Sequence, residues 1–346
     1  MLLNLQKIEN DGWCEASISG SLLEEKYNLI NSKLKIYHKI YSLEKIKLVK
    51  NNCNKQEINK SLLRALLRYN ECSHIFLKKL AIEIAENDKI YKDYYLNLPY
   101  LIFHLPFDNL EAGYFHNDEL TPSQKEITIW ISLNNFQTRY SPISIIKKTH
   151  SFIFNKIFRI LSKFGYLENY IRIFLNKKLI NIIPKEDSIY LWNALTYHKG
   201  NLNTTKCNNF AITMKLSKVP HPYEISYKLS ELFKNQEKNL EYNNDLININ
   251  EIYKSKIEMI NFSLINNLNF EEDFIKYKNF FSKFKLNHLE KKILSFSLSL
   301  FAQRETNEKL KNSIDFFSVL LGSVNKVAEH RLSKIYKKKL LFKFIN

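Results

Sequence analysis

The residues best suited to chemistry are His116 and Asp118, in the segment GYFHNDEL, and His198, which follows SIYLWNALTY. In an extended segment, residues i and i+2 point to the same side, so His116 and Asp118 can offer a nitrogen and a carboxylate oxygen to one ion. A histidine on a neighbouring strand would complete a set of two histidines and one carboxylate, which holds iron(II) and leaves positions open for other ligands. A plain hydrogen-bonded loop pair is the alternative for His116 and Asp118.

Short segments with alternating apolar residues have to position these side chains. From Tyr100 onward the chain contains LIFHLPF, KEITIWISL, ISIIK, SIYLWNAL and NFAITMKL, separated by turn residues. In KEITIWISL the residues Ile127, Ile129, Ile131 and Leu133 alternate with Thr128, Trp130 and Ser132, a period typical of a strand. Several such strands in succession predict a β-sandwich or jelly roll.

Helical patterns surround this strand region. Residues 1 to about 95 have mostly helical spacing, clearest in NKSLLRALLRYNECSHIFLKKLAIEIAEN. The spacing also becomes helical over about 152–184, which predicts an insertion between two strands. After Pro220 long helical patterns continue to the end, so residues 221–346 are expected to form a helical C-terminal region.

Composition limits the class of protein without choosing a function. Lysine and arginine exceed aspartate and glutamate by 52 − 35 = 17, a basic balance that attracts phosphates, anionic sugars, nucleic acid or an anionic membrane. The four cysteines form no CxxC pair, which indicates reduced thiols in a cytoplasmic protein. No apolar run approaches the roughly 18 residues needed to span a bilayer, and the N-terminus has no pattern of a secretion signal.

The order of several motifs resembles that of a known family. A strand with His-x-Asp, the Trp-containing TIWISLNNF, the Thr-His of SIIKKTHS and the His and Gly-x-x-Asn of YHKGNLN follow one another as in the phytanoyl-CoA dioxygenase-like group. The resemblance covers about residues 98–218. It implies an α+β protein with a double-stranded β-helix (jelly roll, cupin-like) core at 96–220, inside an oxygenase domain of residues 1–220 with N-terminal helices and a helical insertion.

The resemblance also implies an activity. The group consists of non-haem iron(II)/2-oxoglutarate-dependent dioxygenases, so His116, Asp118 and His198 would be the catalytic iron ligands, with 2-oxoglutarate and molecular oxygen as cosubstrates. The expected reaction is hydroxylation of a small metabolite, lipid or sugar-linked intermediate, and the basic surface suits an anionic one. His150 matches a family histidine that is not a ligand, which leaves it a structural role or one beside the ligands.

One family residue is missing from the pattern. The group places an arginine eleven residues after the distal histidine, where it pairs with the far carboxylate of 2-oxoglutarate, and here that position is Asn209. An amide lacks the charge that suits arginine to a carboxylate. Lys206 and Arg139 are the candidate substitutes. Lys215 lies on the same face of the expected strand as Asn209, but six residues place it about 20 Å from Asn209.

Two other functions compete with the oxygenase. A catalytically degenerate jelly roll that binds partners or acts as a scaffold is favoured by the missing arginine. Nucleic-acid binding rests on charge alone, without a recognised motif. The basic residues of 325–346 offer a contact to an anionic membrane or a protein partner, and a solvated helix face is the commoner explanation for such residues.

Overall fold

The computed structural model describes residues 5–43, 55–87, 89–97, 99–104, 106–107, 115–118, 126–133, 141–161, 173, 179–220, 226–234, 247–266 and 270–321. These residues form two compact units. Unit 1 comprises residues 1–30 and 74–238, and unit 2 comprises residues 31–73 and 239–346. Among the described helices, none is long and apolar enough to cross a membrane. The basic segment 325–346 lies outside the described residues.

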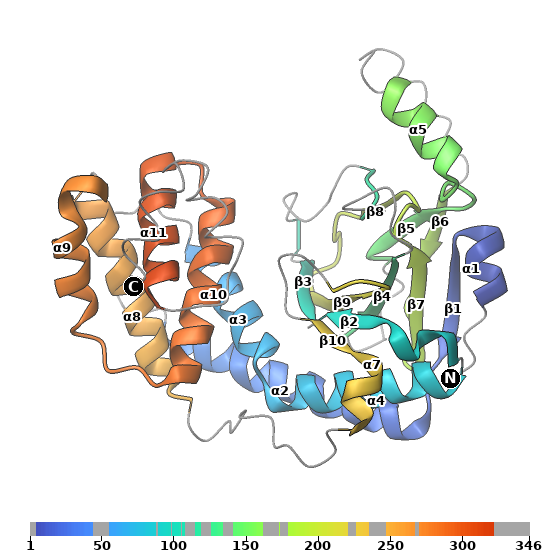
Figure 1. Ribbon diagram of the computed structural model, residues 1–346, viewed down its shortest axis with the longest axis horizontal. Helices are drawn as coiled ribbons and strands as arrows, with labels where there is room; N and C mark the ends of the chain where they lie inside the picture. Colours follow the sequence, from blue (N-terminus) through green and yellow to red (C-terminus); the bar gives the residue numbers. More distant parts are fainter. Residues whose placement is uncertain are drawn as a thin grey trace. The chain divides into compact units, whose positions relative to one another are not determined.

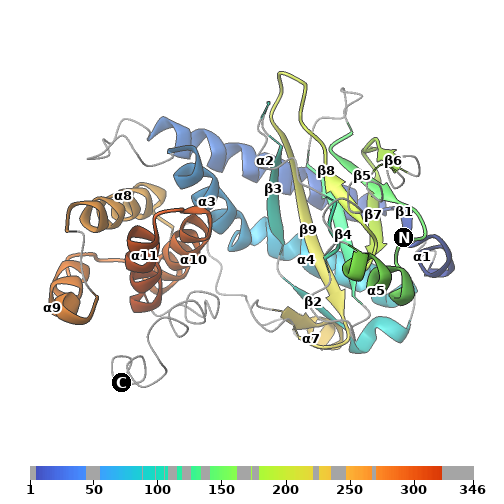
Figure 2. The ribbon, with the colours of Figure 1, turned by 90° about the horizontal axis from the view of Figure 1, so that it is seen from above.

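Unit 1 contains a large antiparallel sheet of seven strands. Its main path runs in the order β1, β7, β4, β9, β2, β10, and β3 also pairs with β9. Figure 2 shows the long β9 between β3 and β4. The strands are β1 (Trp13–Ser17), β2 (Tyr95–Asn97), β3 (Tyr100–His104), β4 (Ile127–Ser132), β7 (Ser188–Asn193), β9 (Asn209–Ser217) and β10 (Ser226–Lys228).

A smaller antiparallel sheet has the order β6 (Leu179–Ile182), β5 (Ile143–Ile146), β8 (His198–Gly200). The two sheets face each other, because side chains from both make one buried cluster. The large sheet contributes Trp130, Tyr190, Trp192 and Ala211, and the small sheet contributes Ile143, Ile145 and Ile182. The protein is therefore a mixture of helices and two packed antiparallel sheets, as the alternating segments indicate.

Three strands lie where the sequence pattern predicted helix. β1 and β10 are edge elements of three to five residues, too short to show a period against the helical patterns beside them. β6 occupies residues 179–182, inside the expected insertion of 152–184. The described helical part of that range is α5 (Phe152–Leu161) and the single residue Ile173.

His150 contacts the turn that precedes β1. β1 starts at a tight turn where Gly12 has φ +83°, and the ring of His150 lies so close that a Cβ at this position would clash with it. The same ring bonds the Glu9 carbonyl oxygen at 2.8 Å, so His150 helps to hold the N-terminal segment.

The helices of unit 1 are α1 (Leu5–Asp11), η1 (Lys89–Asp93) and α7 (Leu229–Lys234), together with parts of α2 (Gly20–Ser42) and α4 (Glu71–Asn87).

Unit 2 is a helical bundle whose interior contains polar side chains. Lys256 is fully buried, and its ammonium donates to the Ile58 carbonyl and to the hydroxyls of Ser61 and Ser297, at 2.6 to 2.7 Å. One lysine thus joins three helices. Besides the end of α2 and the start of α4, the helices of this unit are α3 (Lys55–Arg68), α8 (Ile249–Asn266), α9 (Phe270–Phe281), α10 (His288–Arg304) and α11 (Glu308–Leu320), which Figure 1 shows in blue and in orange to red.

Unit 2 combines two stretches of the chain that are far apart in the sequence. Residues 31–73 group with the C-terminal helices, because α3 packs against α10. Continuous functional regions at 1–220 and 221–346 stay a prediction. A truncation after residue 220 would remove the C-terminal partners of α3, including the contacts of Lys256 with Ile58 and Ser61.

A buried lysine in unit 1 predicts a pH dependence of stability. Burial lowers the pKa of Lys26 to about 8, from an ordinary value of 10.5. Below about pH 8 both the folded and unfolded states carry the proton. Between about pH 8 and 10.5 the unfolded state binds more protons, so the free energy of unfolding rises with pH, by about 3 kcal/mol in total. Chemical denaturation across this range should show a smaller rise in Lys26→Met than in the wild type, because Lys33, whose pKa burial also lowers to about 8, contributes the rest. Equal slopes in the two proteins would contradict the assignment.

Candidate metal centre

Backbone pairing places the His-x-Asp segment beside β8. The amide of His116 donates to the His198 carbonyl at 3.0 Å, and the amide of His198 donates to the His116 carbonyl at 2.9 Å. Two residues later the Asp118 amide donates to the Ala194 carbonyl at 2.9 Å. The segment is thus held extended at both ends, which directs His116 and Asp118 to one side.

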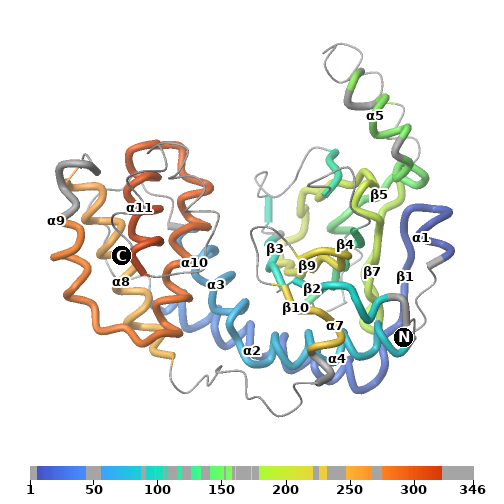
Figure 3. The backbone as a smooth tube through the Cα atoms, in the orientation of Figure 1, coloured from blue at the N-terminus to red at the C-terminus, as the bar shows by residue number. Residues whose placement is uncertain are grey.

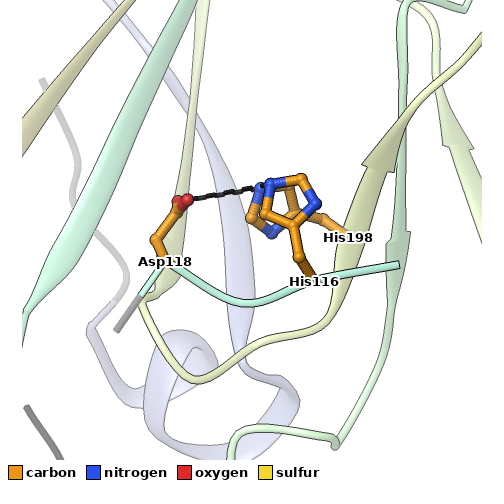
Figure 4. Close-up of side chains that lie close together, drawn as sticks. All are labelled: His116, Asp118 and His198. Atoms are coloured by element: carbon orange, nitrogen blue, oxygen red, sulfur yellow. Dashed lines mark ion pairs between the residues drawn. The ribbon is translucent and has the colours of Figure 1, made fainter. Parts of the chain in front are cut away.

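The three side chains converge on one point. Their ligand atoms all lie within 4.8 Å of one another (Figure 4). The His116 Nε2 is 4.0 Å from Asp118 Oδ1, and the His198 Nε2 is 3.7 Å from Asp118 Oδ2. Adjacent ligands at about 2.1 Å from one ion would be about 3 Å apart, so a small side-chain adjustment completes the set. A metal of the iron(II) type fits this donor set.

Partners of the ligands fix their orientation. The His198 Nδ1 lies 3.1 Å from the Thr196 carbonyl oxygen, which leaves Nε2 directed toward Asp118. The Asp118 Oδ2 accepts from the Thr128 hydroxyl at 2.8 Å and from the Trp192 indole at 3.3 Å. Such second contacts hold a ligand in its binding orientation and raise metal affinity.

The electrostatics of the cluster favour the protonation states that bind metal. Burial alone would raise the pKa of the Asp118 carboxyl, but His198, Lys215 and the Thr128 hydroxyl outweigh it and hold the pKa below its ordinary value. Burial lowers the pKa of the His198 imidazole, against the opposing charge of Asp118. A carboxylate and a neutral imidazole are the forms in which these groups are ligands.

Access to the cluster is unequal among the ligands. The side chain of His116 is 52% exposed, whereas that of His198 is 6% exposed. The Trp192 ring packs beside His198 at a centroid distance of 5.0 Å. The centre is therefore buried on the sheet side and reachable from solvent on the side of His116.

Lys215, which the sequence places far from Asn209 along the strand, lies beside the metal centre. The Lys215 ammonium donates to the Asp118 backbone carbonyl and is 3.6 Å from the Glu126 carboxylate, which is 2% exposed. Lys215 pairs with Thr128 in the sheet register, which places it level with the ligands. Lys215 is about 20 Å from Asn209 along the strand. It is nevertheless close to the metal ligands, because they lie beside its own end of the strand and not beside Asn209.

The three residues predicted to hold the cosubstrate differ in place. Asn209 is buried, and its amide donates to Thr205 Oγ1 at 3.4 Å and to the Cys207 carbonyl at 3.3 Å, within the loop before β9. Lys206 is exposed in the same loop. Arg139 lies outside the described residues.

Two asparagines support the segments that carry the ligands. Asn203 is buried, donates to the Cys207 carbonyl at 2.7 Å and accepts from the Thr205 amide at 3.0 Å, so it braces the loop after β8. Asn155 of α5 accepts from the side chain of Asn117 at 2.6 Å, and it donates to the Thr149 carbonyl at 2.8 Å. The contact of α5 with the His-x-Asp segment joins residues 38 positions apart, and no local pattern predicts it.

Comparison with known proteins gives similarities at the level of structure. No protein-family model matches the chain, and no curated protein matches it. Solved structures that resemble it include EctD from S. alaskensis with 2-oxoglutarate and 5-hydroxyectoine, at 14% identity over 63% of this chain and 77% of that chain, with a TM-score of 0.40. AviO1 from Streptomyces viridochromogenes Tue57 is 10% identical over 65% of this chain and 99% of that chain, with a TM-score of 0.38. A nickel complex of the non-heme monooxygenase ThoJ is 9% identical over 64% of this chain and 82% of that chain, with a TM-score of 0.39.

Proposed function

We propose that the protein is an iron(II)/2-oxoglutarate-dependent dioxygenase of the phytanoyl-CoA dioxygenase-like group, with His116, Asp118 and His198 as the metal ligands. The observation that carries the proposal is the convergence of two imidazoles and one carboxylate within 4.8 Å. Three protein ligands on one side of an ion leave the opposite positions for small molecules, which is the arrangement of non-haem iron oxygenases.

The strand order supports a double-stranded β-helix around this centre. From β3 to β9 the chain passes repeatedly between the sheets, since β4, β7 and β9 belong to the large sheet and β5, β6 and β8 to the small one. Repeated crossing between two antiparallel sheets is the connectivity of a jelly roll. The ligands come from both sides of the entrance, with His198 on the small sheet and Asp118 bonded to two strands of the large one.

When bound, iron(II) with 2-oxoglutarate and molecular oxygen supplies the oxidation of an unactivated C–H bond. The chain has other tasks. Thr128 and Trp192 fix the Asp118 carboxylate, the Thr196 carbonyl fixes the tautomer of His198, and the packed indole of Trp192 keeps water from the buried side. Each of these contacts prepares the centre before any ligand arrives.

For the cosubstrate carboxylate we propose Lys215 first, and Asn209, Lys206 and Arg139 are the candidates if Lys215 is not the partner. Lys215 contacts the backbone of a metal ligand, whereas the amide of Asn209 bonds the loop and Lys206 is exposed. Burial raises the pKa of the Glu126 carboxyl, against the effect of Lys215. The Lys215 ammonium lies beside the backbone of a metal ligand, where a carboxylate could accept a charge-assisted hydrogen bond from it.

The substrate proposed is a small metabolite, lipid or sugar-linked intermediate, and a cytoplasmic location remains our expectation. The degenerate scaffold is the second candidate, and its support was the missing arginine. The intact ligand set argues against it, because a scaffold has no need to hold two imidazoles and a buried carboxylate together with their hydrogen-bond partners.

An anaerobic titration of the apo-protein with iron(II) and 2-oxoglutarate tests the proposal. We expect a visible charge-transfer band, and on admission of oxygen a slow conversion of 2-oxoglutarate to succinate. Both should be absent in His116→Ala and retained in His288→Ala, an exposed histidine at the start of α10 in unit 2. Tight iron binding without the band would show that the centre uses a cosubstrate other than 2-oxoglutarate. The absence of both signals would leave the scaffold.

A further inference from the structure

Helix α5 has an exposed apolar stripe. Ile153, Ile157 and Ile160 are exposed by 72%, 51% and 50%, and their spacing of four and three residues places them on one face. The inward face is fixed by Asn155, which is 3% exposed and bonds three backbone carbonyls of unit 1. Since residues 153 and 155 are about 200° apart around a helix, the stripe points away from the body of the unit.

The charge on and near this helix has one sign. The sequence of α5, FIFNKIFRIL, contains two basic residues and no acidic residue, and Lys156 is exposed beside the stripe. Lys148, just before the helix, is exposed, and the ammonium of Lys199 lies 4.7 Å from the Phe115 ring at the base of the helix. The stripe is thus bordered by cations within a chain of net charge +17.

The base of α5 adjoins the metal centre. Asn155 accepts from Asn117, the residue between His116 and Asp118. Phe154 packs edge to face on Tyr197, the neighbour of His198, at a centroid distance of 6.1 Å. Within unit 1, Figures 1 and 3 show α5 standing clear of the sheets, beyond the ends of β5 and β6. What α5 binds is therefore brought close to the segment that carries His116 and Asp118, on the side of Asn117.

We propose that α5 binds an anionic lipid surface through Ile153, Ile157 and Ile160, with Lys156 and its neighbours at the headgroups. A short helix with aliphatic residues on one face and only basic charges fits the interface of a membrane, where the side chains bury and the cations meet anionic lipid. The helix lies on the surface and does not span it, since none of the described helices is long and apolar enough to cross. Within unit 1 the helix projects from the sheets.

The inference names a substrate class if the proposed function holds. A centre beside a lipid-bound helix would receive an amphipathic molecule, with an anionic head and an apolar chain, directly from the lipid surface. This extension rests on the proposed oxygenase. Lipid binding by α5 does not, so it is measured on the iron-free protein, where its failure and the failure of the oxygenase are separate results.

The test is flotation of the full-length apo-protein with vesicles of phosphatidylcholine, with and without about one third phosphatidylglycerol. We expect binding to the anionic vesicles, weakened by added salt, and a loss of about a hundredfold in the triple variant Ile153→Asn/Ile157→Asn/Ile160→Asn. The matched control is Ile265→Asn/Ile275→Asn in unit 2, whose side chains are 59% and 71% exposed, and it should bind as the wild type. Unchanged thermal melting of both variants shows that they fold.

Several results would overturn the proposal. Vesicle binding that survives the triple variant would assign lipid contact to another surface. Equal binding to neutral vesicles would show that the anionic headgroup is not recognised. No binding to any vesicle would show that α5 does not bind lipid. A dimer in light scattering that dissociates in the triple variant, without vesicle binding, would assign the stripe to a second copy of the chain.

Discussion

Replacing Asp118 with alanine is expected to weaken iron(II) binding by at least about a hundredfold. The variant loses the one carboxylate among the three ligands, and it leaves the hydroxyl of Thr128 and the indole of Trp192 without the oxygen they bond. Neutral imidazoles alone hold a divalent cation less tightly than a set that includes a negative ligand. Anaerobic calorimetry with iron(II), or with manganese(II) as an air-stable probe, measures the difference.

A surface aspartate provides the control for this variant. Asp93 pairs with Lys228 at 3.0 Å, and its side chain is 82% exposed, so Asp93→Ala should bind iron(II) as the wild type does. Binding should also raise the melting temperature of the wild type and of Asp93→Ala, but not of Asp118→Ala, because only a protein that binds the ion is stabilised by it. An affinity of Asp118→Ala within threefold of the wild type would show that the ion binds elsewhere.

The local part of this centre could be predicted from the sequence. Alternation over Ile127–Ser132 identifies a strand, and the structure contains β4 over these residues. The same rule of period two places His116 and Asp118 on one side, which their convergence confirms. Both predictions depend only on residues close together along the chain.

The partners of the ligands could not be predicted in this way. Trp192 and Asp118 are 74 residues apart, and Asn117 and Asn155 are 38 apart, so their contacts depend on how strands pair. Register decides these contacts, and one residue of slip would turn each side chain to the other face. The grouping of α3 with α10 has the same cause, since an amphipathic pattern identifies an apolar face and not the element that covers it.

Only part of the position of Lys215 could be predicted from the sequence. Its parity along the strand places it on the same face as Ala211, which belongs to the core between the sheets. That parity was readable. The distance was measured from Asn209 because the family arginine belongs there, while the pairing of Thr128 with Lys215 brings the lysine level with the metal ligands.

Replacing Lys215 with methionine is therefore expected to lower the affinity of the iron-loaded protein for 2-oxoglutarate by ten- to a hundredfold. Methionine retains the length of the side chain and removes the ammonium, so the carboxylate loses a charged partner in a site where water screens little. Lys206→Met, in the exposed loop, should change the affinity by less than twofold. Lys215→Arg should restore most of it, because a cation is retained. The charge-transfer band reports each affinity directly.

The contact of Lys215 with the Asp118 carbonyl requires that iron binding be measured separately in the same variants. If Lys215→Met binds iron(II) about tenfold more weakly and 2-oxoglutarate unchanged once iron is saturating, Lys215 positions the aspartate and the carboxylate has another partner. Arg139→Met then becomes the decisive variant, since Asn209 is bonded to its loop. If both affinities fall in Lys215→Met, one lysine orients a metal ligand and holds the cosubstrate, which would account for a centre of this kind with asparagine in place of the family arginine.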